Sequence, residues 1–295
     1  MISKKIGVLI TSLSLVLTTA LFAGCGKSSA GTNPAGTKTE ISGSIIALGS
    51  TALQPLAEQA GKDFTSKYPK VQINVQGGGS GAGLNQVSAG TAQIGMSDVT
   101  AEEKIKDSAK AKELTDHKVC VIGFAIVASK DVKVDSLTKK QIQDIFTGKI
   151  TNWKDVGGAD QPIVVINRTA SSGTRATFFN TVMDKTAEKE GLGIVQDSSG
   201  QVRTAISANK GSISYLALSY LTAEVKGDFS IIKIDGIEAN KENITSKIYP
   251  FWSYEHMYTK GEAQGAAKSF IDYMVSDENK TAVEKLGYIP MNDMK

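Results

Sequence analysis

Cysteine and histidine are scarce in this chain of 295 residues, which has two of each. The cysteines are Cys25 and Cys120, and the histidines are His117 and His256. Cys25 ends a motif, described below, that predicts attachment of a lipid to its thiol. An acylated Cys25 would leave Cys120 without a partner, so we expect neither a disulfide framework nor a cysteine metal site. Two histidines do not favour zinc chemistry either. Cys120 lies in the apolar run VCVIGFAIV, and we expect it to be a buried free thiol.

An excess of charge of one sign is also missing. Lys and Arg number 33, Asp and Glu number 30, and the formal net charge is +3. The sequence has no basic block of the kind that contacts nucleic acid. It also has no Walker A lysine motif, no G-x-S-x-G elbow and no evident nucleophile–base pair. We therefore expect a binding protein without a cofactor or a nucleic-acid partner, and not an enzyme.

The first 25 residues have the features of a lipoprotein signal peptide. The basic pair Lys4-Lys5 precedes an apolar region of signal-peptide length, residues 6–22. The following LFAGC resembles a bacterial lipobox, in which the peptide is cut before the cysteine and the cysteine carries the lipid. Phe22 stands where that motif usually has leucine. Lipidation of Cys25 would anchor the chain to the outer face of the cell membrane, whereas a retained membrane anchor is disfavoured by the polar tract that follows.

The segment after the lipobox is polar. Residues 25–40 are rich in Gly, Ser and Thr, which predicts a flexible tether. Cleavage of residues 1–24 would remove two lysines and no acid, and so lower the net charge from +3 to +1. The remaining chain of about 270 residues is long enough for two lobes.

From residue 41 onwards, expected strands alternate with expected helices. Leu56, Ala60 and Phe64 recur at helical spacing in STALQPLAEQAGKDFTSKYP, and LTKKQIQDIFTG is amphipathic. The other expected helices are LNQVSAG, RATFFNTVM, QVRTAISAN and EAQGAAKSFIDYMVS. The expected strands are ISGSIIALG, VQINVQ, QIGMSD, VCVIGFAIVAS, QPIVVIN, GSISYLAL and KIYPFWSYEHMYT. This alternation predicts an α/β fold with largely parallel sheets.

Three turns share one design: each follows an expected strand, carries hydroxyl or glycine residues, and opens an expected helix. They are GSTALQP (49–55), GGGSGAG (77–83) and ASSGTR (170–175). Unpaired N–H groups and a partial positive charge make a helix N-terminus an anion site. Hydroxyls add donors, and glycine permits close approach of the backbone. Each turn alone is more typical of an ordinary cap, linker or surface turn, but three of them in one exported chain indicate an anion site.

Two charged residues beside these turns refine the prediction. Arg168 precedes the third turn, and its planar guanidinium can donate two parallel hydrogen bonds to an oxyanion; a surface salt bridge is the alternative. Asp98 ends QIGMSD, and an ionised carboxylate can only accept hydrogen bonds. Beside an anion it suits a ligand that keeps a proton, as hydrogen phosphate does and sulfate at neutral pH does not. The alternative for Asp98 is a cap for the helix TAEEKIK, and we expect Arg175 to point to an acid or a partner.

Two rival motifs remain. Gly77, Gly79 and Ala82 fit G-x-G-x-x-A after a strand, with an aspartate at the right distance to bind a ribose hydroxyl. A dinucleotide site is disfavoured because the signal peptide sends the chain away from cytoplasmic cofactor and because the other two turns would have no role. Ser136 and Lys139 give S-x-x-K, but they lie at the start of a charged amphipathic helix, where chance spacing is more common.

Together, the lipobox, GSTALQP, QGGGSGAG, IGMSD, NRTASSGTR and GSISYLAL resemble the phosphate-binding proteins of bacterial phosphate ABC importers. NRTASSGTR fits the family's arginine–three residues–Ser-Gly-Thr signature at every defined position. The resemblance runs from about residue 41 to the end and implies the two-lobed periplasmic-binding-protein fold (class II type), with the ligand in the cleft between the lobes. It places lobe one at residues 41–124 plus 250–295 and lobe two at 125–249, with VCVIGFAIVAS and KIYPFWSYEHMYT as hinge strands.

The resemblance also implies the ligand contacts and the function. Which residue of the first turn donates to phosphate is left undecided, because this chain has S-T-A-L-Q-P where some members have T-F-P. The implied phosphate contacts are Ser50, Thr51, the Ala52 amide, Ser80, Asp98 as proton acceptor, Arg168, Ser172, Gly173 and Thr174. The implied protein is a monomeric, lipid-anchored receptor that hands inorganic phosphate to an ABC permease. A receptor for sulfate or molybdate, an extracellular phosphatase, and a surface adhesin or sensor are the alternatives.

Overall fold

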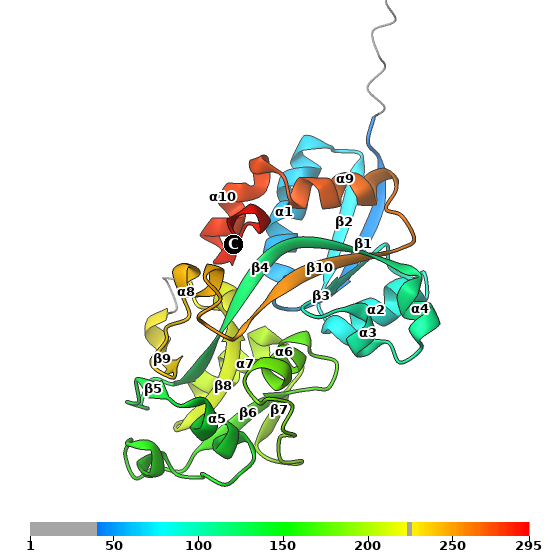
Figure 1. Ribbon diagram of the computed structural model, residues 1–295. Coiled ribbons are helices and arrows are strands. Elements are labelled where there is room, and N and C mark those ends of the chain that lie inside the picture. The colour runs from blue at the N-terminus through cyan, green and yellow to red at the C-terminus, as the bar shows by residue number, and fades with distance from the viewer. Residues whose placement is uncertain (1–39, 223–225, 295) are drawn as a thin grey trace, which may run out of the picture. The chain divides into compact units, whose positions relative to one another are not determined.

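The computed structural model describes residues 40–222 and 226–294. The lipobox with Cys25 and nearly all of the expected tether lie outside these residues. The described chain forms a curled sheet with helices packed against it (Figure 1). Its main strand order is β2-β1-β3-β10-β4-β8-β6-β7. These strands are β1 (Gly43–Gly49), β2 (Val71–Gln76), β3 (Ile94–Ser97), β4 (Leu114–Ser129), β6 (Val164–Arg168), β7 (Ile194–Gln196), β8 (Ser212–Ala217) and β10 (Trp252–Lys260).

The sheet is mixed, which corrects the expectation of largely parallel sheets. At one end β1 pairs in parallel with β2 and β3, and at the other β6 pairs in parallel with β7 and β8. Between these ends, β10 is antiparallel to both β3 and β4, and β4 is antiparallel to β8. The parallel parts are built by strand–helix–strand crossovers. The middle is antiparallel because β4 leads the chain from the first part to the second and β10 brings it back.

Strand β4 belongs to both parts of the sheet. Residues 114–123 pair with β10, and residues 124–129 pair with β8 and with β9 (Phe229–Ile234). The apolar run of β4 is buried from Val119 onwards, as a strand covered on both faces requires. Cys120 lies in this run as a buried free thiol, as predicted, and burial raises its pKa well above the usual range.

The helices follow the expected apolar spacing. Helix α1 starts at Gln54, with Pro55 in its first turn, where the missing N–H of proline removes no intrahelical bond, and it buries Leu56, Ala60 and Phe64. The other helices are α2 (Ser80–Ser88), α3 (Ala101–Lys104), α4 (Ser108–Lys112), α5 (Lys139–Phe146), α6 (Gly173–Thr181), α7 (Ser199–Ala208), α8 (Lys241–Thr245), α9 (Gly265–Met274) and α10 (Asp277–Lys285). The sequence did not predict β7, β9, α8 or α10, which lack a clear period.

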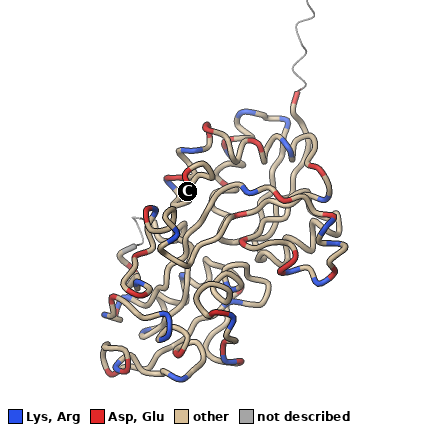
Figure 2. The backbone as a smooth tube through the Cα atoms, in the orientation of Figure 1, with Lys and Arg blue, Asp and Glu red and all other residues tan. Residues whose placement is uncertain are grey.

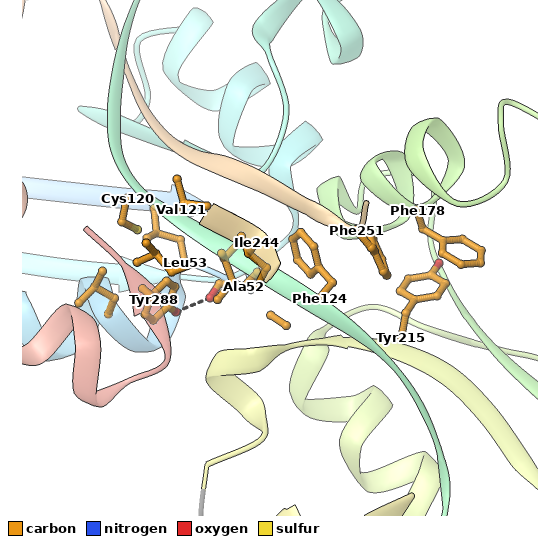
Figure 3. Packing of buried hydrophobic residues seen from close by; sticks show 14 of the residues in the cluster. Ala52, Leu53, Cys120, Val121, Phe124, Phe178, Tyr215, Ile244, Phe251 and Tyr288 are labelled. Carbon is orange, nitrogen blue, oxygen red and sulfur yellow. Dashed lines mark hydrogen bonds between the residues drawn. The ribbon is translucent and has the colours of Figure 1, made fainter. Parts of the chain in front are cut away.

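Aromatic packing joins the two parts of the sheet (Figure 3). Phe124 of β4 lies 5.0 Å from Phe251, ring centre to ring centre, and Phe251 lies 5.6 Å from Phe178 of α6. Phe178 in turn stacks on Tyr215 of β8 at 4.4 Å. Burial of each such ring contributes about 1.5–3 kcal/mol. Residues far apart in the sequence therefore share one apolar core.

Charged positions of both signs are interspersed along the described chain (Figure 2). This distribution agrees with the balanced composition. In the described ranges, every helix is too short or too polar to cross a membrane.

Candidate functional site

The third turn opens helix α6. Ser172 is the N-cap of this helix, and its hydroxyl oxygen accepts a hydrogen bond from the Arg175 amide at 3.1 Å. Gly173 is the first helical residue and packs tightly. A Cβ added there would overlap the Ser80 hydroxyl and lie 2.9 Å from the side chain of Asp98. Glycine at this position therefore lets the third turn approach the second turn and Asp98 closely.

The second turn opens helix α2, with Ser80 as its first residue. Ser80 Oγ accepts a hydrogen bond from the Asp98 amide at 3.0 Å and donates to Asp98 Oδ1 at 3.3 Å. The Gly81 amide donates to the Ser171 carbonyl at 2.9 Å. The second and third turns come from different parts of the sheet, and these contacts bring them together.

The two hydroxyl residues of the first turn, Ser50 and Thr51, have different hydrogen-bond partners. Ser50 Oγ accepts hydrogen bonds from the amides of Ala52 and Leu53, at 3.1 and 3.0 Å. The Thr51 hydroxyl instead reaches the other part of the sheet and lies 3.0 Å from Ser199 Oγ. Ser50 thus orders the turn, while Thr51 faces Arg168. In this arrangement the Ala52 amide is bonded to Ser50 and would have to be released to contact a ligand.

Arg168, at the end of β6, has a fractional exposure of only 1%. Its Nη2 donates to Thr51 Oγ1 at 3.2 Å and to the Asp197 carbonyl at 3.1 Å, and its Nη1 donates to Ser199 Oγ at 3.3 Å. Its Nε has no hydrogen-bond partner among residues 40–222 and 226–294. Burial lowers the pKa of Arg168, while Tyr215 and Asp98 act in the opposite sense.

No carboxylate in the described part of the chain forms an ion pair with Arg168. Its neighbours are neutral hydroxyl and carbonyl groups, and the alternative of a surface salt bridge is therefore wrong. Burying a charge costs several kcal/mol unless an opposite charge compensates for it. The guanidinium with its free Nε is consequently suited to bind an anion.

Asp98 follows β3 and is 2% exposed. Its Oδ2 accepts a hydrogen bond from the Thr174 hydroxyl at 2.8 Å, and Oδ1 accepts from Ser80. It does not cap α3, because Thr100 is the N-cap and forms a capping box with Glu103. The helix-cap alternative for Asp98 is therefore wrong, and the carboxylate lies where the second and third turns meet.

Arg175 and Lys104 donate hydrogen bonds to backbone carbonyls in and next to the third turn. Arg175 Nη1 donates to the Arg168 carbonyl at 2.8 Å, and its Nε donates to Glu188 at 2.6 Å, so it does point to an acid as expected. Lys104 Nζ donates to the carbonyls of Ala170 and Ser172, both at 2.9 Å. Burial lowers the pKa of Lys104.

Sequence reasoning missed Ser199, which contacts both Thr51 and Arg168. It is the first residue of α7, behind the N-cap Ser198. The segment DSSG follows the short strand β7 and has the same design as the three predicted turns, so the same rule could have found it. Two tyrosines also went unrecognised: Tyr220 donates to the Thr51 carbonyl at 2.8 Å, and Tyr288 donates to the Ala52 carbonyl.

Neither of the two rival motifs, G-x-G-x-x-A and S-x-x-K, forms the site that its pattern would indicate. A Cβ added at Gly79 would lie 2.9 Å from the Ser171 carbonyl, so the third turn fills the space that a pyrophosphate would need above this loop. Ser136 bonds the backbone of β9 and the following turn, whereas Lys139 pairs with Asp184. In the parts of the chain that the structure describes, no group of three or more His, Cys, Asp or Glu side chains could hold a metal ion.

Comparisons with known proteins place this chain in a family. The model of a PBP superfamily domain matches residues 33–278. The phosphate-binding protein PstS of Bacillus subtilis is 47% identical over 257 residues, which are 87% of this chain and 83% of that protein. PstS of Borreliella burgdorferi is 26% identical over 262 residues, which are 85% of this chain and 92% of that protein.

Solved structures agree. A protein described as a phosphate ABC transporter substrate-binding protein, from Clostridium perfringens and with bound phosphate, has a TM-score of 0.78 at 34% identity; the match covers 84% of this chain and all of that one. An ABC-type phosphate transport receptor from Vibrio cholerae has a TM-score of 0.66 at 27% identity, with coverage of 83% and 99%. The chain therefore belongs to the PBP superfamily and, within it, to the family of phosphate-binding proteins.

Proposed function

We propose that this protein binds inorganic phosphate between Arg168 and Asp98 and delivers it to an ABC importer. The observation that carries the proposal is the buried guanidinium of Arg168, which has hydroxyl neighbours but no carboxylate partner among the residues that the structure describes. The N-termini of α2, α6 and α7 carry site residues and add backbone donors and partial positive charge. The names of the relatives support the same ligand.

Asp98 supports phosphate over other tetrahedral oxyanions. It is an acceptor in a site otherwise made of donors, so a bound oxyanion satisfies it only by bringing a proton. Hydrogen phosphate has that proton and sulfate does not. We therefore propose the contacts implied by the resemblance, with Thr51 rather than Ser50 as the hydroxyl donor of the first turn and with Ser199 added.

Isothermal titration with phosphate, sulfate and molybdate tests this function. We expect one phosphate per chain, bound far more tightly than sulfate. Sulfate or molybdate binding as tightly as phosphate would favour the alternative oxyanion receptor. Release of phosphate from a phosphomonoester would favour the phosphatase, whereas we expect binding without turnover.

We further propose that the ligand holds two lobes together, residues 41–124 with 250–295 and residues 125–249. Strands β4 and β10 run between these parts and would act as the hinge. Because the site takes Thr51, Ser80 and Asp98 from one part and Arg168 and Thr174 from the other, phosphate can close the molecule by binding the closed form better. A fall in the radius of gyration on adding phosphate, measured by small-angle X-ray scattering, would support this motion; an unchanged radius would contradict it.

The proposed location is the outer face of the cell membrane, with the chain monomeric and anchored by a lipid on Cys25. The permease would then recognise the closed, loaded form. Labelling of cells with a palmitate analogue should mark the wild-type protein and leave a Cys25→Ser variant unmarked. Equal labelling of both would rule out this anchor.

A further inference from the structure

Glu255 is a buried carboxyl group that the proposed phosphate contacts do not use. It lies in β10, is 0% exposed, and neither of its oxygens has a hydrogen-bond partner within the described part of the chain. On one side it pairs with Cys120 of β4. On the other side, the next residue, His256, pairs with Ser97 of β3, which directly precedes Asp98, and the Asp98 carboxylate lies near Glu255.

The surroundings of Glu255 disfavour a charge on it. No cation among residues 40–222 and 226–294 forms an ion pair with Glu255. Burial raises its pKa well above the usual range, and the nearby Asp98 carboxylate raises it further, while Ser50 acts in the opposite sense. The other titratable groups that face it, Cys120 and Tyr288, also have pKa values raised by burial and stay neutral.

A neutral carboxyl group carries an O–H donor that needs an acceptor. The hydroxyl oxygen of Ser50, which neighbours Glu255, already accepts two amide hydrogens from Ala52 and Leu53, so it offers no free lone pair to the Glu255 proton. Tyr288 donates its own hydroxyl to the Ala52 carbonyl. Neither hydroxyl therefore offers an acceptor for the Glu255 proton, and an oxyanion bound beside Asp98 and the first turn would supply one.

We propose that Glu255 is a second carboxyl group of the phosphate site, held as the neutral acid, and that it donates its proton towards the bound oxyanion. The inference rests on the proposed phosphate function. The two carboxyl groups have opposite roles: Asp98 accepts a hydrogen bond from the ligand, and Glu255 donates one to it. With Glu255 neutral, the charges of Arg168 and Asp98 cancel, whereas an ionised Glu255 would leave the site negative and repel the anion.

The pH dependence of phosphate affinity tests this role. We expect the affinity of the wild type to fall as the pH rises through the raised pKa of Glu255 in the free protein, approaching a tenfold loss per pH unit above it. Glu255→Gln cannot ionise at this position, so its phosphate affinity should lose this dependence on pH. Glu262→Gln, at an exposed position after β10, should keep it. Lys104, whose pKa is lowered, titrates alike in all three proteins.

The same pH dependence of phosphate affinity in the wild type and in Glu255→Gln would overturn the proposal. Failure of the wild type to bind phosphate near neutral pH would instead overturn the proposed function, so the two failures are distinguishable. Infrared spectra of the phosphate-loaded wild type give a test that does not depend on a variant folding. A protonated-carboxyl band at neutral pH that shifts on ¹³C-labelling of glutamate supports the proposal, and its absence contradicts it.

Discussion

The two sides of the site handle charge in opposite ways. On one side, Arg168 lies among Thr51 and Ser199, so a cation is surrounded by neutral groups that leave its charge uncompensated. On the other side, each oxygen of Asp98 accepts one hydrogen bond, from Ser80 or Thr174, so hydroxyls stabilise an anion that can still accept a hydrogen bond from a ligand. The first side should provide affinity for any oxyanion, and the second should decide which oxyanion is accepted.

Removing the positive side should have the largest effect. Arg168→Ala should weaken phosphate binding by about 2–5 kcal/mol, because the buried ligand loses its charged partner. Titration calorimetry would measure the loss, with the exposed Arg203→Ala as the matched control. Unchanged affinity in Arg168→Ala would remove this residue from the ligand contacts.

Altering the negative side should change selectivity more than affinity for oxyanions in general. Asp98→Asn keeps the shape but can donate to an oxygen without a proton, so sulfate no longer leaves a buried carboxylate unpaired. We expect the preference for phosphate over sulfate to fall by about 1–3 kcal/mol. Competition titrations measure it, with the exposed Asp63→Asn as control. An equal preference in wild type and Asp98→Asn would refute the selective role of Asp98.

The contact between the second and third turns depends on Gly173. Gly173→Ala would place a methyl group against Ser80 and Asp98, and such overpacking costs about 1–3 kcal/mol. We expect weaker phosphate binding with little change in overall helix content. Gly200→Ala is the control, because its added Cβ would meet only Ser198 Oγ, at 3.9 Å. Similar phosphate affinities in the two variants would show that the close approach is unimportant.

The smallest effect is expected at the residue that sequence reasoning missed. Ser199→Ala removes a hydroxyl that contacts Arg168 and Thr51, which should weaken phosphate binding by about 0.5–1.5 kcal/mol. Ser207→Ala, at an exposed position in the same helix, serves as control. A loss as large as that of Arg168→Ala would mean that Ser199, and not the guanidinium, dominates the positive side.

The sequence predicted the local features better than the long-range ones. The three turns, the end of the strand at Arg168 and the position of Asp98 follow from short patterns, because caps and strand ends are set by neighbouring residues. The antiparallel pairing of β4 and β10 could not be predicted from alternation of strands and helices, since it depends on where the chain returns.

Glu255 illustrates the same limit at the level of one side chain. In KIYPFWSYEHMYT it reads as an ordinary polar residue of a strand, and no short pattern shows that it is buried near Asp98. Its environment is created by β3, β4 and the first turn, which are distant in the sequence. The same holds for the missing ion-pair partner of Arg168, which becomes evident only once the fold surrounds the guanidinium.

A crystal structure with phosphate tests the central claim most directly. We predict a single oxyanion that receives hydrogen bonds from the Arg168 guanidinium and the hydroxyls of both parts of the sheet, with one of its oxygens within hydrogen-bond distance of the Asp98 carboxylate. Phosphate bound elsewhere, or bound at Arg168 without contact to Asp98, would contradict the account.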